Sequence, residues 1–183
     1  MPLNRTTFFI LSCITLFGFS LIGMGAIWLF SATPVCELLQ VTPYYWQLLF
    51  GTGYGLATAL IAISVVETEA LQPNTRYFQG FIKSANLRFI DTVFASISAG
   101  IGEEILFRGA VQPFLGIWIT AIIFVAIHGY LSLEDWGIFS YGVLMVLMSA
   151  GLGYLCNWLG IGAAMAAHAV FDIVIFRHIL TRN

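Results

Sequence analysis

The chain has 183 residues, of which 60% are hydrophobic, 15% aromatic and only 9% charged. A typical soluble domain carries roughly 25% charged residues, so this chain has too little polar surface to cover a soluble globule. Its seven Lys and Arg residues and net charge of −2 exclude a nucleic-acid binder, which needs a basic surface. The composition therefore predicts an integral membrane protein whose surface contacts the lipid bilayer.

Long uncharged runs predict an all-α chain that crosses the membrane about six times. A helix needs about 20 apolar residues to span the hydrocarbon, and such runs are too long for the alternating strands of a membrane barrel. The expected spans are Phe8–Phe30, Tyr44–Val66, Phe89–Val111, Phe114–Tyr130, Gly137–Cys156 and Leu159–Phe176. Pro113 separates the third span from the fourth. We expect a single transmembrane domain, 1–183, whose motif-bearing part is 89–176.

The basic residues predict the orientation of the chain. Six of the seven lie on the N-terminal flank, in the polar stretch 67–88 and in the C-terminal tail. They are Arg5, Arg76, Lys83, Arg88, Arg177 and Arg182. Six crossings place these regions on one side, which the positive-inside rule makes cytoplasmic. We expect both termini in the cytoplasm of a cell whose plasma membrane, or prokaryotic inner membrane, holds the protein. The stretch 67–88 is either an amphipathic surface helix or a plain loop.

Ionisable residues interrupt the third, fourth and sixth apolar runs. They are Glu103, Glu104, Arg108, His128, His168 and Asp172. Each charged group at the centre of a membrane helix costs roughly 2.5–3.5 kcal/mol. We therefore expect these side chains to meet in a polar cavity inside the helical bundle. For any one of them a purely structural ion pair is the simpler interpretation, but the whole set favours a functional site.

Spacing along each helix predicts which of these side chains form pairs. Glu104 and Arg108 are four residues apart, on one helix face, where they can form an ion pair. Glu103 lies about 100° further round, over small residues, so we interpret it as the free carboxylate and Glu104 as the structural one. His168 and Asp172 are also four residues apart, and this carboxylate could fix the tautomer of the imidazole.

A carboxylate and two imidazoles around a water molecule can hydrolyse an amide without a covalent intermediate. The carboxylate deprotonates the water, one imidazole serves the water or the leaving amine, and the other donates to the developing oxyanion. Phe124, one turn before His128, would line this cavity. One carboxylate and two histidines also match the ligand count of a catalytic zinc site, although no HExxH motif occurs. We expect no metal or other cofactor, with zinc as the lesser alternative.

Three motifs resemble those of the CAAX-protease and bacteriocin-processing family (CPBP, or Abi). Residues 103–109, Glu-Glu-Ile-Leu-Phe-Arg-Gly, match its EExxxR motif. Residues 124–128, Phe-Val-Ala-Ile-His, match its FxxxH motif, and residues 168–172, His-Ala-Val-Phe-Asp, match its HxxxN/D motif. Each motif alone is weak, but all three in this order are specific. The resemblance implies a glutamic intramembrane endopeptidase with a helical bundle around a polar cavity.

The resemblance also implies a role for each matching residue. Glu103 resembles the base that activates water, and His128 its partner. His168 and position 172 resemble the pair that stabilises the oxyanion. Glu104 and Arg108 resemble the supporting ion pair.

Asp172 departs from the pattern of the CAAX-cleaving members, which typically carry Asn at this position. Asn can donate a hydrogen bond to an oxyanion, whereas an ionised Asp cannot. Either Asp172 is protonated, or it orients His168, which then donates alone. This departure makes a prenylated CAAX end a less secure substrate and leaves other membrane-anchored proteins or peptides open as substrates.

Counting residues along the spans gives the expected depth of the site. At 1.5 Å per residue, Glu103 lies about 10 Å below the side opposite the termini, His168 about 15 Å, and His128 about 15–20 Å. These values favour the half of the bilayer away from the termini. We therefore expect the substrate to be cut near the non-cytoplasmic surface.

Two other classes of function remain open at this point. One is a non-proteolytic scaffold or immunity protein that keeps the fold and binds a partner membrane peptide. Such a scaffold would tolerate Glu103→Ala, which a protease would not. The other is an ion or proton carrier that uses the same polar residues, although the sequence contains no broken helices or inverted repeat that would favour it.

Overall fold

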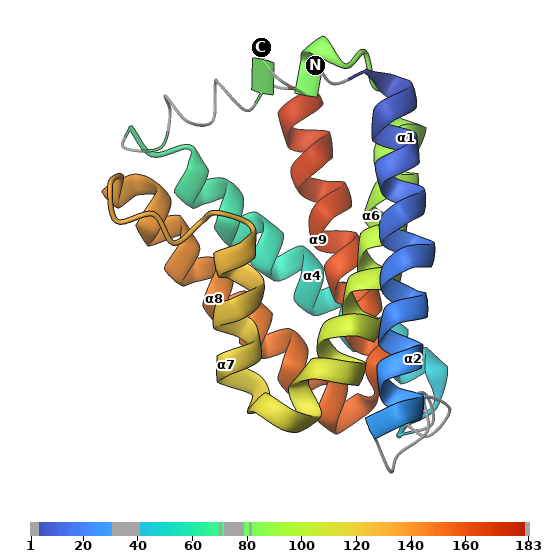
Figure 1. The fold of residues 1–183 in the computed structure, drawn as a ribbon. Coiled ribbons are helices and arrows are strands. Elements are labelled where there is room, and N and C mark those ends of the chain that lie inside the picture. Colours follow the sequence, from blue (N-terminus) through green and yellow to red (C-terminus); the bar gives the residue numbers. More distant parts are fainter. Residues whose placement is uncertain (1–3, 31–40, 70, 72–78, 81, 182–183) are drawn as a thin grey trace.

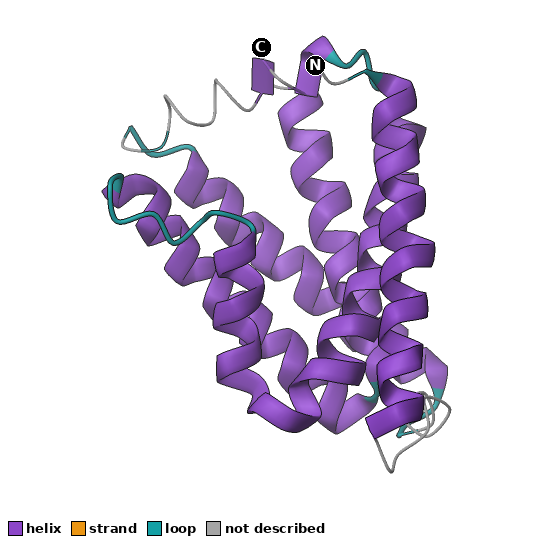
Figure 2. Cartoon of the chain, viewed as in Figure 1, coloured by secondary structure: helices purple, strands orange, loops and turns teal. Residues whose placement is uncertain are grey.

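The computed structural model describes residues 4–30, 41–69, 71, 79–80 and 82–181. The basic residues Arg76 and Arg182 lie outside this part of the chain. Within it, helices dominate and no strand occurs (Figure 2). The helices are α1 (Arg5–Cys13), the π-helical η1 (Ile14–Phe19), α2 (Ser20–Phe30), α4 (Tyr44–Val66), α6 (Phe89–Glu104), the π-helical η2 (Ile105–Val111), α7 (Gln112–Ile127), α8 (Trp136–Leu159) and α9 (Ile161–Thr181). Of the stretch 67–88, residues 79–80 and 82–84 are helical.

Among the described residues, five helical stretches are long and apolar enough to cross a membrane. They are Arg5–Phe30, Tyr44–Val66, Phe89–Ile127, Trp136–Leu159 and Ile161–Thr181. The third contains two of the six expected spans, because the chain reverses direction within it (Figure 1). The reversal is at Gly116, whose φ of 75° is rarely adopted by residues with a side chain. Pro113 instead lies in the first turn of α7, where proline is tolerated. The all-α bundle of about six helices is confirmed, with this boundary moved.

Local hydrogen bonds and one glycine set the ends of several helices. The Asn4 side chain accepts a bond from the Thr7 N–H and caps α1. The Asp135 side chain accepts one from the Ile138 N–H and caps α8 in the same way. Gly160 alone separates α8 from α9; its φ of 121° favours glycine, and a Cβ there would collide with the Gln47 side chain. The α8–α9 turn is therefore both tight and covered by α4.

The α4 and α9 helices approach each other closely through small residues. A Cβ atom at Gly51 would collide with the carbonyl of Ala163, and one at Gly55 with the carbonyl of Ala167. Small residues four apart allow such backbone contact between membrane helices. The GxxxG pattern of α4 therefore serves ordinary helix packing.

α9 is the central helix of the bundle, and it contacts α4, α6 and α8 (Figure 1). On the α6 side, Gly100 faces the carbonyl of Met165 and the side chain of Ala169, again without room for a Cβ. This approach brings the end of α6 level with the middle of α9. The residues of the first and third motifs are thereby placed next to each other.

The start of α1, the start of α6 and the end of α9 lie at one end of the bundle (Figure 1). There the Arg5 guanidinium and the Asp91 carboxylate form a two-bond ion pair, with Nε–Oδ2 at 2.7 Å and Nη2–Oδ1 at 2.9 Å. The exposed aromatics Tyr44, Tyr45 and Trp46 begin α4 at the opposite end, as expected of an interfacial belt. Which end faces the cytoplasm stays a prediction from the basic residues.

The α4–α9 contact predicts a strong difference between two glycines of one helix. Gly55→Ala should lower the free energy of unfolding by about 1–3 kcal/mol, because the new methyl group overpacks the interface. Gly53→Ala is the matched control, since a Cβ there meets nothing within 4 Å; it should leave stability unchanged or slightly raised. Thermal unfolding of the purified variants in detergent measures both. Equal effects at the two positions would contradict the packing described.

Candidate active site

The six ionisable residues predicted from the sequence come together in one cluster. Glu103 and Glu104 end α6, Arg108 lies in η2, His128 follows the last residue of α7, and His168 and Asp172 lie on α9. Ion pairs or hydrogen bonds link every member to at least one other. Four separate helical elements therefore contribute to the cluster, as the cost of isolated charges in a membrane requires.

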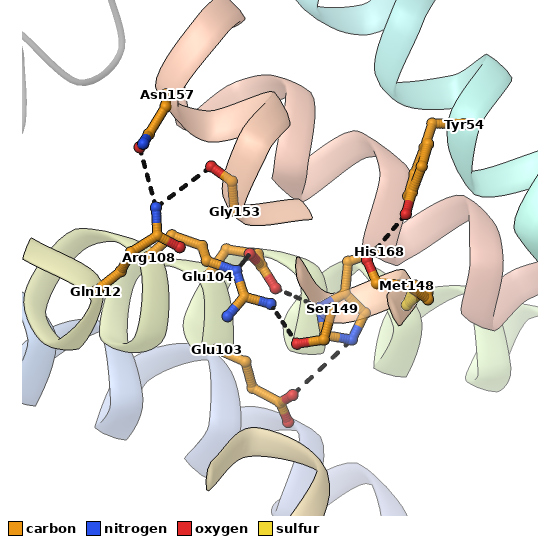
Figure 3. Close-up of polar contacts among 10 residues, drawn as sticks. All are labelled: Tyr54, Glu103, Glu104, Arg108, Gln112, Met148, Ser149, Gly153, Asn157 and His168. Atoms are coloured by element: carbon orange, nitrogen blue, oxygen red, sulfur yellow. Dashed lines mark hydrogen bonds and ion pairs between the residues drawn. The ribbon is translucent and has the colours of Figure 1, made fainter. Parts of the chain in front are cut away.

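Glu104 is the buried centre of this cluster, with no exposed side-chain surface. Its Oε2 lies 3.0 Å from Nε of Arg108, and its Oε1 lies 2.8 Å from Nδ1 of His168 (Figure 3). Nη2 of Arg108, which is equally buried, donates to the Ser149 hydroxyl on α8 at 2.9 Å. The predicted Glu104–Arg108 pair is therefore present, and it ties α6 and η2 to α8 and α9.

The carboxylate that orients His168 comes from α6 and not from α9. Glu104 forms the hydrogen bond to Nδ1, whereas the nearest oxygen of Asp172 lies 3.7 Å from Nε2, beyond hydrogen-bond distance. The expectation that Asp172 fixes the His168 tautomer is therefore wrong. Nδ1 of His168 is committed to Glu104, which leaves Nε2 as the ring nitrogen that faces Glu103 and Asp172.

Glu103 is the free carboxylate, as its position on the helix predicted. Its Oε2 lies 3.9 Å from Nε2 of His128 and 3.8 Å from Nε2 of His168. These distances are too long for direct hydrogen bonds and suit a bridging water. In Figure 3 the Glu103 side chain lies apart from the Glu104–Arg108 pair, and a dashed line joins it to His168.

The tautomer of His128 follows from its backbone contact. Its Nδ1 lies 2.6 Å from the carbonyl oxygen of Phe124. Because a carbonyl only accepts hydrogen bonds, Nδ1 carries the proton and donates. In the neutral ring, Nε2 then has a lone pair on the side of Glu103. It can accept a hydrogen bond from a water held between them.

Phe124 lines the site, as the sequence predicted. The ring centroids of Phe124 and His128 are 4.5 Å apart, and the Phe124 and His168 rings meet edge to face at 5.8 Å. The guanidinium of Arg108 lies 5.4 Å from the Phe124 centroid, within range of a cation–π contact. Phe124 therefore neighbours the buried cation and both imidazoles.

A cavity of about 240 Å³ adjoins the cluster, and Glu103, His128, His168 and Asp172 all line it. Its other lining residues are mostly apolar side chains of α8 and α9. On α9 none of the lining residues precedes His168, and the cavity continues along Ile175, Phe176 and Ile179 toward the end where the chain termini lie. The polar cluster is thus at the deep end of a cavity that extends toward the termini.

This direction adds to the depth of the site that the sequence predicts. His168 is about 10 Å from the Ile161 end of α9 and about 20 Å from the Thr181 end, so the cluster does lie in the half away from the termini. The space that leads to it runs from the other half. The cavity thus joins the cluster to the half of the bundle in which the termini lie.

Sequence reasoning missed three residues around the cluster. Ser149 accepts the hydrogen bond from Arg108, and Tyr130 and Tyr141 line the cavity. Ser149 is one small residue in an apolar run, where nothing in the sequence distinguishes it. Tyr130 follows His128 by two residues, and its closeness to the second motif was the only available signal.

The zinc alternative requires a set of free ligands. Among the residues that the structure describes, no group of three or more His, Cys, Asp and Glu side chains could hold a metal ion. Both histidines use Nδ1 within the protein, His128 with a backbone carbonyl and His168 with Glu104, and both keep Nε2 on the side of Glu103.

Comparisons with known proteins identify one family and one relative. A family model described as type II CAAX prenyl endopeptidase Rce1-like matches residues 85–174, which include all three motifs. The uncharacterized protein YpbD of Bacillus subtilis (strain 168) is 31% identical over 127 residues, 66% of this chain and 65% of the relative. The match thus covers slightly less than two thirds of that protein. The comparison with solved structures found no match.

The buried ion pair predicts that Arg108 is needed for stability. Arg108→Met should lower the free energy of unfolding by about 3–5 kcal/mol, because Glu104 would keep a buried charge without its cation. Adding Glu104→Gln to that variant should restore part of the loss. Arg177→Met removes an exposed arginine at the end of α9 and serves as the control. Denaturant unfolding in detergent measures all three, and a tolerated Arg108→Met would contradict the assignment.

Proposed function

The chain belongs, over residues 85–174, to the Rce1-like family of type II CAAX prenyl endopeptidases, and we propose that it hydrolyses a peptide bond within the membrane by means of a glutamate-activated water. The observation that carries this proposal is the position of Glu103. Its carboxylate lies within 4 Å of Nε2 of both His128 and His168, at the deep end of a cavity. The family is one of proteases, and this geometry suits the chemistry of a protease.

The first step is the attack of water on the scissile carbonyl. Water held between Glu103 and His128 gives a proton to the Glu103 carboxylate as its oxygen bonds to the carbonyl carbon. The π electrons of the carbonyl move onto its oxygen, and the resulting oxyanion needs hydrogen-bond donors. His168 can donate from Nε2 when its ring carries both protons, because Nδ1–H is committed to Glu104.

The second step breaks the C–N bond. The proton taken up by Glu103 passes to the leaving amine, directly or through Nε2 of His128. The oxyanion reforms a carbonyl, and the product is a carboxylic acid and a free amine. No covalent intermediate with the protein forms. Glu104 and Arg108 take no proton in this scheme; they position His168.

The substrate is a membrane-associated protein or peptide that approaches from the side of the termini. The apolar lining contributed by α8 and α9 suits a hydrophobic segment. If the basic residues place the termini in the cytoplasm, such a substrate enters from the cytoplasmic side and is cut in the opposite half of the bilayer. Prenylated ends are then among the substrates to test, together with unmodified membrane peptides.

The proposal predicts that Glu103→Gln abolishes cleavage while the protein still folds. Gln keeps the shape of the side chain but cannot take a proton from water, so product formation should fall by about a thousandfold or more. Mass spectrometry of membrane peptides from cells with wild-type protein or with Glu103→Gln measures the products and shows where each is cut. Glu134→Gln, in the exposed α7–α8 loop, is the matched control and should give the wild-type peptides.

The same comparison decides between the protease and the scaffold. Peptides that depend on Glu103 identify both the activity and the cut bond. Identical peptide sets from the wild type and Glu103→Gln would overturn the protease proposal. A non-proteolytic scaffold that uses the same cluster for binding would then be the better explanation.

A metal-free mechanism predicts that chelators leave cleavage unchanged. The general base, its imidazole partner and the oxyanion donor all come from side chains, so no step requires a Lewis acid. Purified protein treated with EDTA or 1,10-phenanthroline should cut its peptides at the untreated rate. If the chelator abolishes activity and added zinc restores it, this mechanism is contradicted and a catalytic zinc site is favoured.

A further inference from the structure

The motif residues supply only one clear hydrogen-bond donor, His168, to the oxyanion of the proposed reaction. The position that in CAAX-cleaving members carries Asn is here Asp172, and an ionised carboxylate cannot donate to an oxyanion. In addition, Nε2 of His168 faces two carboxylates, Glu103 at 3.8 Å and Asp172 at 3.7 Å. The oxyanion of the proposed reaction therefore needs a second donor from another part of the cavity.

Only two further side chains among the described residues that line the cavity carry a polar hydrogen. They are Tyr130, in the α7–α8 loop, and Tyr141, on α8. Tyr130 is the better placed of the two, because its ring neighbours His128 directly, whereas Tyr141 neighbours the ring of Tyr130. Among the described residues, no hydrogen-bond partner occupies the Tyr130 hydroxyl.

The ring of Tyr130 lies beside the imidazole of His128. The two rings are stacked, with centroids 6.3 Å apart and planes 7° from parallel. Tyr141, on α8, meets the Tyr130 ring edge to face, with centroids 5.3 Å apart. Two ring neighbours thus position Tyr130, and one of them is the imidazole that serves the water in the proposed reaction.

Backbone contacts also hold Tyr130 in place. α7 ends at Ile127, and Gly129, with a φ of 79°, then lets the chain turn sharply. The Tyr130 N–H then bonds back to the Val125 carbonyl at 3.4 Å. The Tyr130 carbonyl packs directly on Gly142, where a Cβ would collide with it. A donor that is held in place before the reaction stabilises a developing charge most effectively.

We propose that Tyr130 is a further catalytic residue of the proposed peptidase, whose phenol O–H donates a hydrogen bond to the carbonyl oxygen of the scissile bond as that oxygen becomes an oxyanion. It fills the place of the amide that Asp172 lacks. Tyr130 keeps its proton throughout: the hydrogen bond strengthens as negative charge develops and weakens when the carbonyl reforms. Asp172 then acts as a charge partner of His168.

Tyr130→Phe tests this inference, because it removes the hydroxyl and keeps the ring that stacks on His128. The probe is the set of membrane peptides that wild-type protein produces and Glu103→Gln does not, followed over time by mass spectrometry. Loss of one oxyanion donor should slow their appearance by about 100-fold, with thermal stability unchanged. Tyr154→Phe removes the hydroxyl of an α8 tyrosine whose ring is tilted against that of Trp158 and which does not line the cavity; it should leave the rate at the wild-type value.

A second variant separates a lost donor from a disturbed fold. Asp172→Asn in the Tyr130→Phe protein supplies an amide donor in the same cavity, so it should recover about tenfold of the lost rate. A merely structural role for the Tyr130 hydroxyl predicts no such recovery. Tyr141→Phe should cost less than Tyr130→Phe, and the reverse order would overturn the assignment to Tyr130.

This inference rests on the proposed function, and the two can fail separately. If no peptide depends on Glu103, the peptidase proposal is wrong and this inference falls with it. If peptides depend on Glu103 but appear at the wild-type rate with Tyr130→Phe, the peptidase stands and only the role of Tyr130 is wrong.

Discussion

The fully buried Glu104 carboxylate, held between the Arg108 guanidinium and the His168 imidazole, is the contact on which the rest of the site depends. A charge inside a membrane bundle persists only with a cation and hydrogen bonds around it. Because both oxygens of Glu104 are taken, its neighbour Glu103 is the carboxylate left for the cavity. The same contact turns Nε2 of His168 toward Glu103. One ion pair thereby assigns different tasks to two adjacent, chemically identical side chains.

Close backbone packing brings these residues to one depth. Gly100 lets α6 approach α9, and the reversal at Gly116 leaves about 16 Å of helix between the turn and the end of α7. That length crosses only about half of a bilayer. His128, which follows this half-length helix, therefore lies inside the membrane region, level with Glu103 and His168. A full-length α7 would carry the imidazole past the carboxylate.

Hydropathy and helical periodicity were sufficient to predict the bundle, but features that depend on contact between helices could not be predicted from them. Uncharged runs predicted the all-α architecture, and four-residue spacing predicted the Glu104–Arg108 pair. The same spacing wrongly favoured Asp172 as the partner of His168, because a pattern within one helix cannot reveal a neighbour from another. The boundary between the third and fourth spans was predicted at Pro113, whereas the chain reverses direction at Gly116. Depth along a helix could not show from which side the cavity is reached, nor that Tyr130 lines it.

The central claim is that Glu103 performs chemistry while Glu104 maintains structure. The most direct test uses two purified variants, Glu103→Gln and Glu104→Gln. It measures for each the thermal stability and the yield of the peptides that wild-type protein produces. The account predicts that Glu103→Gln melts within a few degrees of wild type and yields no product, whereas Glu104→Gln, which strands Arg108, melts well below it. A stable Glu104→Gln protein together with an active Glu103→Gln protein would contradict the account.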